Sequence, residues 1–273
     1  MADTVFMTDA DFEKYRMLIY KESGIHFTST NRSILESRLK ERLREKHLDT
    51  INEYFVLISK DQGELKSFLD SITTNLTRFF RNQAHFDALE NYVVPELIKI
   101  KKQSGNNTIR IWSAGCSTGE EPYTIAMLLS EVLSPPWKFE IVASDLSLKS
   151  LMSAQSGFYA ESRIAGVPDD YLKKYFEKVE GGYKITGNVM SKIRFDYHNL
   201  INDSGLRNMD VVFCRNVIIY FDEAAQNAVI NKFWDSMNSK SFLFIGHSES
   251  LFGMDTKFEF LKTQWATLYS KSI

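Results

Sequence analysis

Hydrophobic residues in the first third of the chain recur at helical spacing. Within residues 33–46, leucines lie four residues apart and would share one face of a helix (Leu35, Leu39 and Leu43). Two pairs of a threonine and an acid, three residues apart, have the spacing of capping boxes that open helices (Thr8 with Asp11, Thr50 with Glu53). Gly24 is suited to end the first helix, and residues 64–73 continue the helical pattern. Residues 8–90 are therefore predicted to be helical.

From about residue 106 the pattern changes to short β-rich runs separated by helical stretches. The runs are Ile109–Ser113, Phe139–Ser144, Ile193–Tyr197, Asp210–Cys214 and Ser241–Gly246, and the helical patterns are Glu121–Leu133, Lys149–Gln155 and Glu223–Met237. This alternation predicts βαβ units and a mainly parallel sheet. Glycine-rich residues 157–192 interrupt it and are predicted to form a small antiparallel insertion. The predicted domains are residues 1–90, a helical domain with a linker, and residues 91–273, an α/β domain.

Composition and charge narrow the choice of partners. The 273 residues are 44% hydrophobic, enough for a sizeable core, and the formal net charge is −2. No overall basic field therefore draws the molecule onto nucleic acid or an anionic membrane. Residues 1–10 show no basic and apolar leader pattern, and no apolar run reaches membrane-spanning length. We expect a cytoplasmic protein without membrane insertion.

The two cysteines, Cys116 and Cys214, lie in apolar, strand-like surroundings. They lack CxxC spacing and a histidine cluster, which argues against a zinc site, and a disulfide is disfavoured. No metal is expected.

The segment Ile109–Tyr123 (IRIWSAGCSTGEEPY) contains the strongest chemical signal. A strand ends at Ser113, and a glycine-containing turn follows it. In a doubly wound sheet, ligands bind at such a turn. The turn is Gly-x-x-x-Gly, starting at Gly115, and not the Gly-x-Gly-x-x-Gly of dinucleotide-binding proteins. Glu120 and Glu121 follow at once and would repel a pyrophosphate, but they suit a cationic ligand with an amino group and a sulfonium. Alternatively, these two acids only favour the helix dipole.

Asp145 ends the second predicted strand. An acid there is placed to accept hydrogen bonds from ribose hydroxyls. It also precedes a predicted helix, so it would equally serve as an N-cap. The glycine turn on the neighbouring strand favours ribose binding without excluding the cap.

Several segments give the chain a specific resemblance. They are Thr73–Arg81 (TTNLTRFFR), the turn already described, Phe213–Phe221 (FCRNVIIYF) and Gly246–Ser250 (GHSES). In this order they resemble the CheR family of chemoreceptor methyltransferases, over most of the chain. The resemblance implies an α/β fold, in which a small N-terminal helical domain precedes a Rossmann-like S-adenosylmethionine-dependent methyltransferase domain with an inserted antiparallel β-subdomain.

The resemblance also implies roles for individual residues. S-adenosylmethionine is the expected cofactor, and S-adenosylhomocysteine the product. The expected cofactor-binding residues are Asn75, Thr77, Arg81, Gly115, Glu121 at the amino group, Asp145 at the ribose, Asn199 and Leu200 beside the adenine, Arg215 and Asn216. Arg81 and Tyr220 match the pair that handles the acceptor carboxylate and the transferred methyl group. Without the resemblance, Asn75 and Thr77 would be ordinary caps, Arg81 a surface ion pair and Tyr220 core filling.

The implied reaction methylates glutamate γ-carboxylates in the cytoplasmic helical region of methyl-accepting chemotaxis receptors. Arg38 and Arg42 lie one turn apart on a helix of positive local charge, and they are predicted to dock this acidic partner. The alternative is a solvated surface of ion pairs. The 176–183 hairpin looks too short to bind a C-terminal receptor peptide, so a tether is doubted. A monomer is expected.

Other functions remain open from the residues alone. They are a methyltransferase with another acceptor, such as nucleic acid, and a non-catalytic module that binds S-adenosylmethionine in signalling. A nicotinamide-dependent oxidoreductase is disfavoured by the glycine pattern and the paired acids. The low overall charge disfavours nucleic acid. His247 receives no catalytic role, because an ionised carboxylate needs no base.

Overall fold

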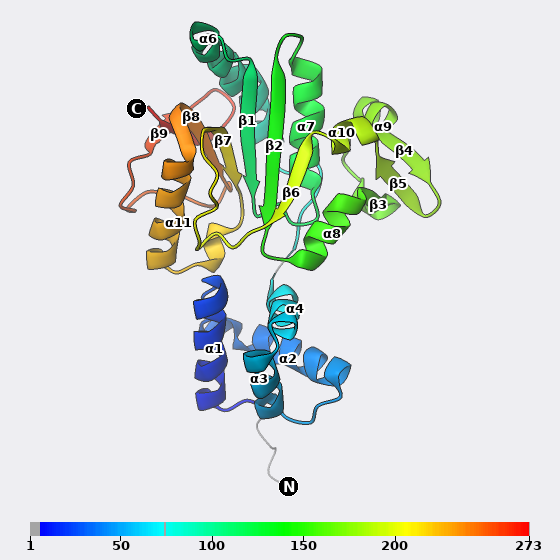
Figure 1. Ribbon diagram of the computed structural model, residues 1–273, viewed down its shortest axis with the longest axis vertical. Helices are drawn as coiled ribbons and strands as arrows, with labels where there is room; N and C mark the ends of the chain where they lie inside the picture. Colours follow the sequence, from blue (N-terminus) through cyan, green and yellow to red (C-terminus); the bar gives the residue numbers. More distant parts are fainter. Residues whose placement is uncertain (1–5, 74, 273) are drawn as a thin grey trace.

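The computed structural model describes residues 6–73 and 75–272 (Figure 1). Residues 1–5, Thr74 and Ile273, which include part of the predicted N-terminal region and of the 73–81 segment, lie outside the described residues. A helical part at the bottom of Figure 1 is followed by an α/β part with a small lateral sheet. The predicted fold class, a helical domain before an α/β domain with an antiparallel insertion, is confirmed.

The helical part is built around the predicted leucine stripe. Its elements are α1 (Asp9–Ser23), a 3-10 turn η1 (Ser29–Asn31), α2 (Arg32–Lys46), α3 (Ile51–Lys60) and α4 (Gln62–Ile72). Both predicted capping boxes are present, at the starts of α1 and α3, and Gly24 ends α1 with φ 76°. The stripe of α2 is buried against aromatic side chains of α1, α3 and α4 (Tyr15, Tyr54 and Phe68).

The α/β part contains one sheet of parallel strands with an antiparallel edge. Its strand order is β6 (Ile193–Tyr197), β2 (Lys138–Asp145), β1 (Thr108–Ala114), β7 (Met209–Cys214), β8 (Met237–Ile245), β10 (Thr267–Lys271) and β9 (Glu259–Lys262). The first five are mutually parallel, whereas β10 pairs antiparallel with β8 and β9. The five predicted strands are confirmed. The sequence pattern missed β9 and β10, since each offers only two adjacent large apolar residues.

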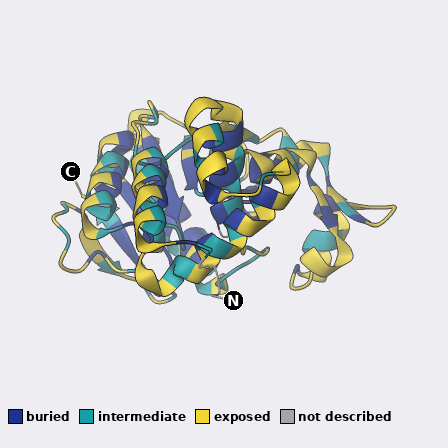
Figure 2. Cartoon of the chain, turned by 90° about the horizontal axis from the view of Figure 1, so that it is seen from below, coloured by how far each residue is buried: buried dark blue, intermediate teal, exposed yellow. Residues whose placement is uncertain are grey.

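Helices cover the two faces of this sheet. They are α5 (Gln83–Ala88), a π-helical turn η2 (Leu89–Val93), α6 (Val94–Ser104), α7 (Glu120–Val132), α8 (Leu148–Ser156) and α11 (Glu223–Ser236), with a 3-10 turn η4 (Ile218–Tyr220) before α11. Figure 2 shows the strands dark blue between helices whose outward faces are exposed. Helix α6, which had not been singled out in the sequence, presents Val94 and Leu97 to this core.

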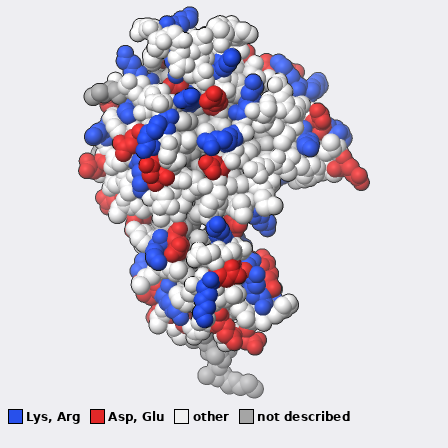
Figure 3. Space-filling model, viewed as in Figure 1, with Lys and Arg blue, Asp and Glu red and all other residues white. Residues whose placement is uncertain are grey.

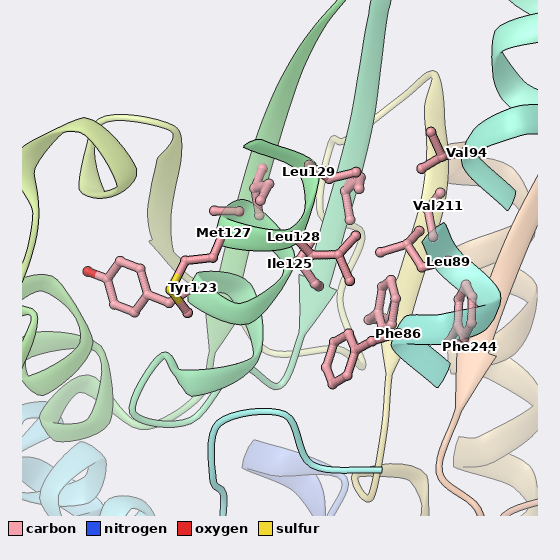
Figure 4. Packing of buried hydrophobic residues seen from close by; sticks show 14 of the residues in the cluster. Phe86, Leu89, Val94, Tyr123, Ile125, Met127, Leu128, Leu129, Val211 and Phe244 are labelled. Atoms are coloured by element: carbon pink, nitrogen blue, oxygen red, sulfur yellow. The ribbon is translucent and has the colours of Figure 1, made fainter. Parts of the chain in front are cut away.

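The segment before α6 is packed as part of the α/β core. Phe86 and Leu89 lie next to Val211 and Phe244 of the sheet (Figure 4). Phe79, earlier in the chain, joins the same core. Phe79, Phe86 and Leu89, which belong to the predicted helical domain and linker of residues 1–90, are therefore fixed to the sheet by apolar burial. Helical character alone did not reveal to which domain they would attach.

Residues 158–190 form the predicted insertion. Its elements are β3 (Phe158–Ala160), a 3-10 turn η3 (Glu161–Arg163), α9 (Asp169–Tyr175), β4 (Phe176–Val179), β5 (Gly182–Ile185) and α10 (Gly187–Met190). The strands are antiparallel in the order β3-β5-β4. They project to one side of the main sheet (Figure 1).

The described residues contain two cysteines and other potential metal ligands. Cys116 and Cys214 are both free and buried. Over residues 6–73 and 75–272, no helix has the length and apolar character to cross a bilayer, and no group of three or more His, Cys, Asp and Glu side chains is arranged to hold a metal ion.

Candidate active site

The carboxyl ends of β1, β2 and β7 face the helical part (Figure 1). Residues from both parts line one pocket there. Strands, the 75–81 linker and the segment after α1 all contribute to its lining. Every cofactor-binding and catalytic residue predicted from the sequence lines this pocket: Asn75, Thr77, Arg81, Gly115, Glu121, Asp145, Asn199, Leu200, Arg215, Asn216 and Tyr220. Residues separated by more than a hundred positions are thus brought to one cavity.

The turn after β1 needs glycine at its first position. Gly115 has φ 80°, and a Cβ atom there would lie 2.4 Å from Cγ2 of Val217. Ser117 is also left-handed, with φ 49°. Its backbone N–H donates to Oδ2 of Asp145 at 2.8 Å. The turn is therefore held in a strained shape by a side chain from the neighbouring strand.

Asp145 combines a structural contact with a place in the pocket. Its Oδ1 accepts a 2.8 Å hydrogen bond from the backbone N–H of Ser147. Ser147, and not Asp145, is the N-cap of α8, so the simple cap interpretation does not describe its position. Burial raises the pKa of Asp145, and the hydrogen bonds from Ser147 and Ser117 counteract this. A carboxylate with one N–H on each oxygen retains lone pairs for further donors, such as ribose hydroxyls.

Glu121 and Arg215 form an ion pair inside the pocket. Oε2 of Glu121 lies 3.2 Å from Nη1 of Arg215, and Oε1 accepts from Oγ of Ser113 at 2.8 Å. Nη2 of Arg215 donates to the backbone carbonyl of Arg81. Burial lowers the pKa of the Arg215 guanidinium, whereas the nearby Glu121 charge raises it. The pair therefore joins the strand β7, the helix α7 and the linker.

Glu249 supports the pocket loop at Asn216 and Val217, a role that the sequence did not indicate. Its carboxylate accepts backbone N–H groups from Asn216 at 2.8 Å and Val217 at 3.1 Å, and from Gly246. Asn216 is left-handed, with φ 60°. Burial raises the pKa of Glu249, and these N–H groups counteract it. The GHSES segment contained the signal, because an acid directly after a strand end is able to organise the neighbouring loop.

The helical part forms one wall of the pocket. The backbone N–H of His26 donates to the carbonyl of Tyr220 at 2.8 Å, and Ile25 pairs with Phe221 in an isolated bridge. Nδ2 of Asn199 donates to the carbonyl of Glu22 at 2.8 Å. The segment after α1 therefore holds the turn that carries Tyr220. The sequence did not indicate this contact between the two parts.

The linker supplies the opposite wall. Nη1 of Arg81 donates to the carbonyl of Leu76 at 2.8 Å, so its guanidinium folds back over its own segment. Nδ2 of Asn75 lies 3.3 Å from Oγ1 of Thr73, a local contact of the kind expected for a turn. Thr77 is half-buried beside them. Arg81 lines the pocket, and no ion pair to it occurs among the described residues.

The predicted docking arginines have different surroundings. Arg42 has 11% of its side chain exposed and is bonded to the buried Glu64, to Glu45 and to the hydroxyl of Tyr54. This contradicts the prediction for Arg42, because its charge is already neutralised within the domain. Arg38 keeps 43% exposure and has only a 3.4 Å contact with Glu41. Figure 3 shows basic and acidic side chains interspersed over the helical part on the face in view.

The lining fits a polar, nucleoside-like cofactor. Nε of Arg215, Oγ of Ser117 and Nε2 of His198 are buried polar atoms without a protein partner, and all three residues line the pocket. Unpaired buried polar atoms are costly unless a ligand or water satisfies them. With Asp145 and Glu121 facing the same space, a hydroxyl-bearing and amino-bearing ligand meets complementary groups at several points.

These features define the class: an S-adenosylmethionine-dependent methyltransferase, with a sheet-end pocket lined by acids and without a pyrophosphate-binding glycine pattern. Residues 75–267 match the family described as CheR methyltransferase, SAM binding domain, and residues 10–73 match CheR methyltransferase, all-alpha domain. The chain therefore belongs to the CheR methyltransferase family. The predicted family and cofactor are thereby confirmed.

Curated relatives cover almost the whole chain. The chemotaxis protein methyltransferase of Borreliella burgdorferi is 38% identical over 256 residues, 90% of each chain. Chemotaxis protein methyltransferase 2 of Vibrio cholerae is 30% identical over 98% of this chain and 94% of its own. The Escherichia coli chemotaxis protein methyltransferase is 32% identical over 94% of this chain and 90% of its own.

Proposed function

We propose that this protein transfers a methyl group from S-adenosylmethionine to glutamate γ-carboxylates of methyl-accepting chemotaxis receptors in the cytoplasm, forming methyl esters during sensory adaptation. The observation that carries the proposal is the position of Arg81 and Tyr220 in the same pocket as the predicted cofactor-binding residues. The names of the relatives, chemotaxis protein methyltransferases, support the receptor as acceptor.

The chemistry asks little of the protein beyond positioning. A glutamate carboxylate has a reference pKa of about 4.3 and is ionised at neutral pH, so no general base is required. S-adenosylmethionine, when bound, supplies a methyl group on a sulfonium. Aligning acceptor and donor and excluding water is worth roughly 7–11 kcal/mol in favourable cases.

Arg81 is proposed to orient the acceptor carboxylate. Its planar guanidinium matches two carboxylate oxygens, and within the described residues it donates a hydrogen bond to the carbonyl of Leu76. Orientation matters more than tight binding, because a carboxylate held too strongly is a weaker nucleophile. Tyr220, fixed through its backbone carbonyl, is proposed to steer the acceptor from the other wall.

Helix α2 is proposed to guide the acceptor to the pocket. Ile34 lines the pocket and is half-exposed, and Arg38 lies one turn further along the same face. An acidic helical segment of the receptor would thus meet a positive charge beside the pocket entrance. The β4–β5 hairpin has only Glu180 and Gly181 between its strands. We propose that this short hairpin does not bind a receptor peptide as a tether. We also propose that the protein works as a monomer.

The direct test uses tritiated S-adenosylmethionine and receptor-containing membranes. Label that enters the receptor band and leaves as methanol in alkali is expected, since carboxyl methyl esters hydrolyse in base and N-methyl groups do not. Membranes without receptors are the control. Label that resists alkali, or that appears on nucleic acid, would contradict the proposal, as would an unlabelled receptor when cofactor binding is demonstrated separately.

A further inference from the structure

The two acids at the start of α7 have separate partners. Glu121 lines the pocket and contacts Arg215, as described above. Glu120 is 0% exposed, does not line the pocket, and pairs with Arg163 of the inserted subdomain. The sequence suggested either a ligand role or a helix-dipole role for Glu120. Its position instead makes it a connection between the cofactor turn and the insertion.

A second residue of the turn is held from the same side. Nη2 of Arg163 also donates to Oγ1 of Thr118 at 2.8 Å, and that hydroxyl donates to Oε2 of Glu120 at 2.7 Å. The hydroxyl of Tyr159, from β3, donates to the carbonyl of Thr118 at 2.6 Å. Two residues of the insertion therefore hold the side chain and the backbone of the turn that Gly115 begins.

The turn has little freedom to settle elsewhere. A Cβ atom on Gly119 would lie 2.9 Å from Cβ of Ala154 and 3.0 Å from the hydroxyl of Tyr159. On the other side, Asp145 holds the left-handed Ser117. The turn is thus held from two sides, by Asp145 at the end of β2 and by Tyr159 and Arg163 of the insertion.

We propose that Arg163 is a positioning residue for the cofactor: through Glu120 and Thr118 it holds the Gly115–Gly119 turn in its cofactor-binding shape and so sets the affinity for S-adenosylmethionine. Arg163 itself lines no part of the pocket. Its side chain is 41% exposed and ends on a carboxylate that is wholly buried. Because a buried charge needs its partner, loss of Arg163 acts first on the turn beside Glu120.

The test compares Arg163→Met with Lys178→Met. Lys178 is in the same subdomain and pairs with Glu161 at 3.7 Å, with 70% of its side chain exposed and no contact to the turn. Both variants lose one positive charge. Calorimetric affinities for S-adenosylmethionine and S-adenosylhomocysteine are measured, with thermal unfolding as the check on the fold. We expect Arg163→Met to bind about tenfold more weakly, the size of one lost hydrogen bond to a charged group, and Lys178→Met to bind normally.

A readout without cofactor separates this role from a general loss of stability. Hydrogen exchange in the free protein is expected to rise in residues 113–121 of Arg163→Met and to stay unchanged in the helical part. Faster exchange throughout the chain, or an affinity within twofold of the parent, would overturn the proposal.

Coupling between the two residues completes the test. Glu120→Gln combined with Arg163→Met is expected to weaken binding no more than the stronger single change, because both remove one interaction. Additive losses would mean that the residues act separately and would refute the proposal. Should Arg163→Met fail to fold, Arg163→Lys keeps the charge and loses the double contact to Glu120 and Thr118. Weaker binding by that folded variant supports the role, and unchanged binding overturns it.

Discussion

Arg215 reaches across the pocket to Glu121, with 3.2 Å between its Nη1 and the Oε2 of the acid. The two residues follow β7 and open α7, so their contact fixes the relative positions of two walls. Nε of Arg215 is left without a protein partner inside the pocket. The pair therefore presents polar groups to the pocket, and we propose that Glu121 binds the cofactor's amino group there while Nε of Arg215 remains available as a donor.

Changing Glu121 to glutamine is expected to weaken cofactor binding. The change keeps the shape but removes the charge that faces Arg215 and that we propose binds the cofactor's amino group, a loss of about 1.5–3 kcal/mol for a charge-assisted hydrogen bond. Calorimetry with S-adenosylhomocysteine measures it. Glu140→Gln, at an exposed acid on β2 that pairs with Arg110, is the control. Equal affinities of the two variants would show that Glu121 does not contact the cofactor.

Gly115→Ala is expected to abolish measurable cofactor binding. A Cβ atom would lie 2.4 Å from Val217, and φ is 80°. Gly105→Ala is the matched control, since Gly105 has a φ of 69° but nothing within 4 Å of the added atom. Both variants carry the backbone strain of a left-handed alanine, roughly 1–2 kcal/mol, and only the first one distorts the pocket. Normal binding by Gly115→Ala would contradict the close packing of the turn against Val217.

The sequence predicted the residues that line the pocket better than the residues that hold its loops in place. Gly115, Glu121 and Asp145 follow strand ends, where the rule for parallel sheets gathers ligand-binding residues, and the family resemblance added the linker residues. Glu249 and Arg163 were not predicted. Glu249 contacts backbone N–H groups, and Arg163 contacts the buried acid Glu120. Such contacts depend on tertiary distances that no local sequence pattern encodes.

The helical part shows the same limit. The spacing of Leu35, Leu39 and Leu43 gave the buried face of α2 correctly. The same spacing put Arg38 and Arg42 on one exposed face, but α4 brings Glu64 against Arg42 and leaves only 11% of the Arg42 side chain exposed. A periodic pattern identifies the apolar side of a helix, and it does not show which charged residues a neighbouring helix will cover.

Arg81→Ala is expected to lower turnover at least about a hundredfold with little effect on the fold, because misplacing the acceptor costs alignment at the reacting atoms. The side chain is half-buried, and its hydrogen bond within the described residues goes to the carbonyl of Leu76. Single-turnover methylation measures the effect, and Arg110→Ala, at an exposed arginine on β1, controls for lost charge. Near-normal turnover at saturating cofactor would remove Arg81 from the catalytic residues.

His85 is expected to make the fold sensitive to acid. Burial lowers its pKa to about 3, and the Arg215 and His247 charges add to this. Between about pH 6.5 and 3 the unfolded chain binds a proton that the folded chain does not, so stability is present above that window and falls as pH decreases through it, by up to roughly 1.4 kcal/mol per unit.

Replacing His85 with phenylalanine removes this proton uptake and keeps an aromatic ring beside Phe244. Urea unfolding at pH 7 and pH 5 should therefore show a smaller acid loss in His85→Phe than in the parent protein. His47→Asn is the control, since His47 is exposed at the end of α2 with φ 54°, a backbone conformation that asparagine tolerates. An identical acid loss in His85→Phe and the parent would show that His85 is not the responsible group.

Arg38→Glu is expected to weaken receptor methylation while leaving cofactor affinity unchanged. Arg38 is exposed on α2 one turn beyond Ile34 at the pocket. A change at Arg42 would instead remove one of the two cations that pair with the buried Glu64, the other being Lys46, and would weaken the domain itself. Arg44→Glu provides the comparison, because Arg44 is exposed on the same helix but about 240° around its axis from Arg38, and both changes alter net charge equally.

Receptor methylation is measured at several receptor concentrations and two salt concentrations. A docking contact raises the KM for receptor in Arg38→Glu alone, and the difference shrinks in high salt because exposed charges are screened. Equal KM values for the two variants would show that only the overall charge of α2 matters, and a parallel loss of cofactor affinity would place Arg38 outside acceptor docking.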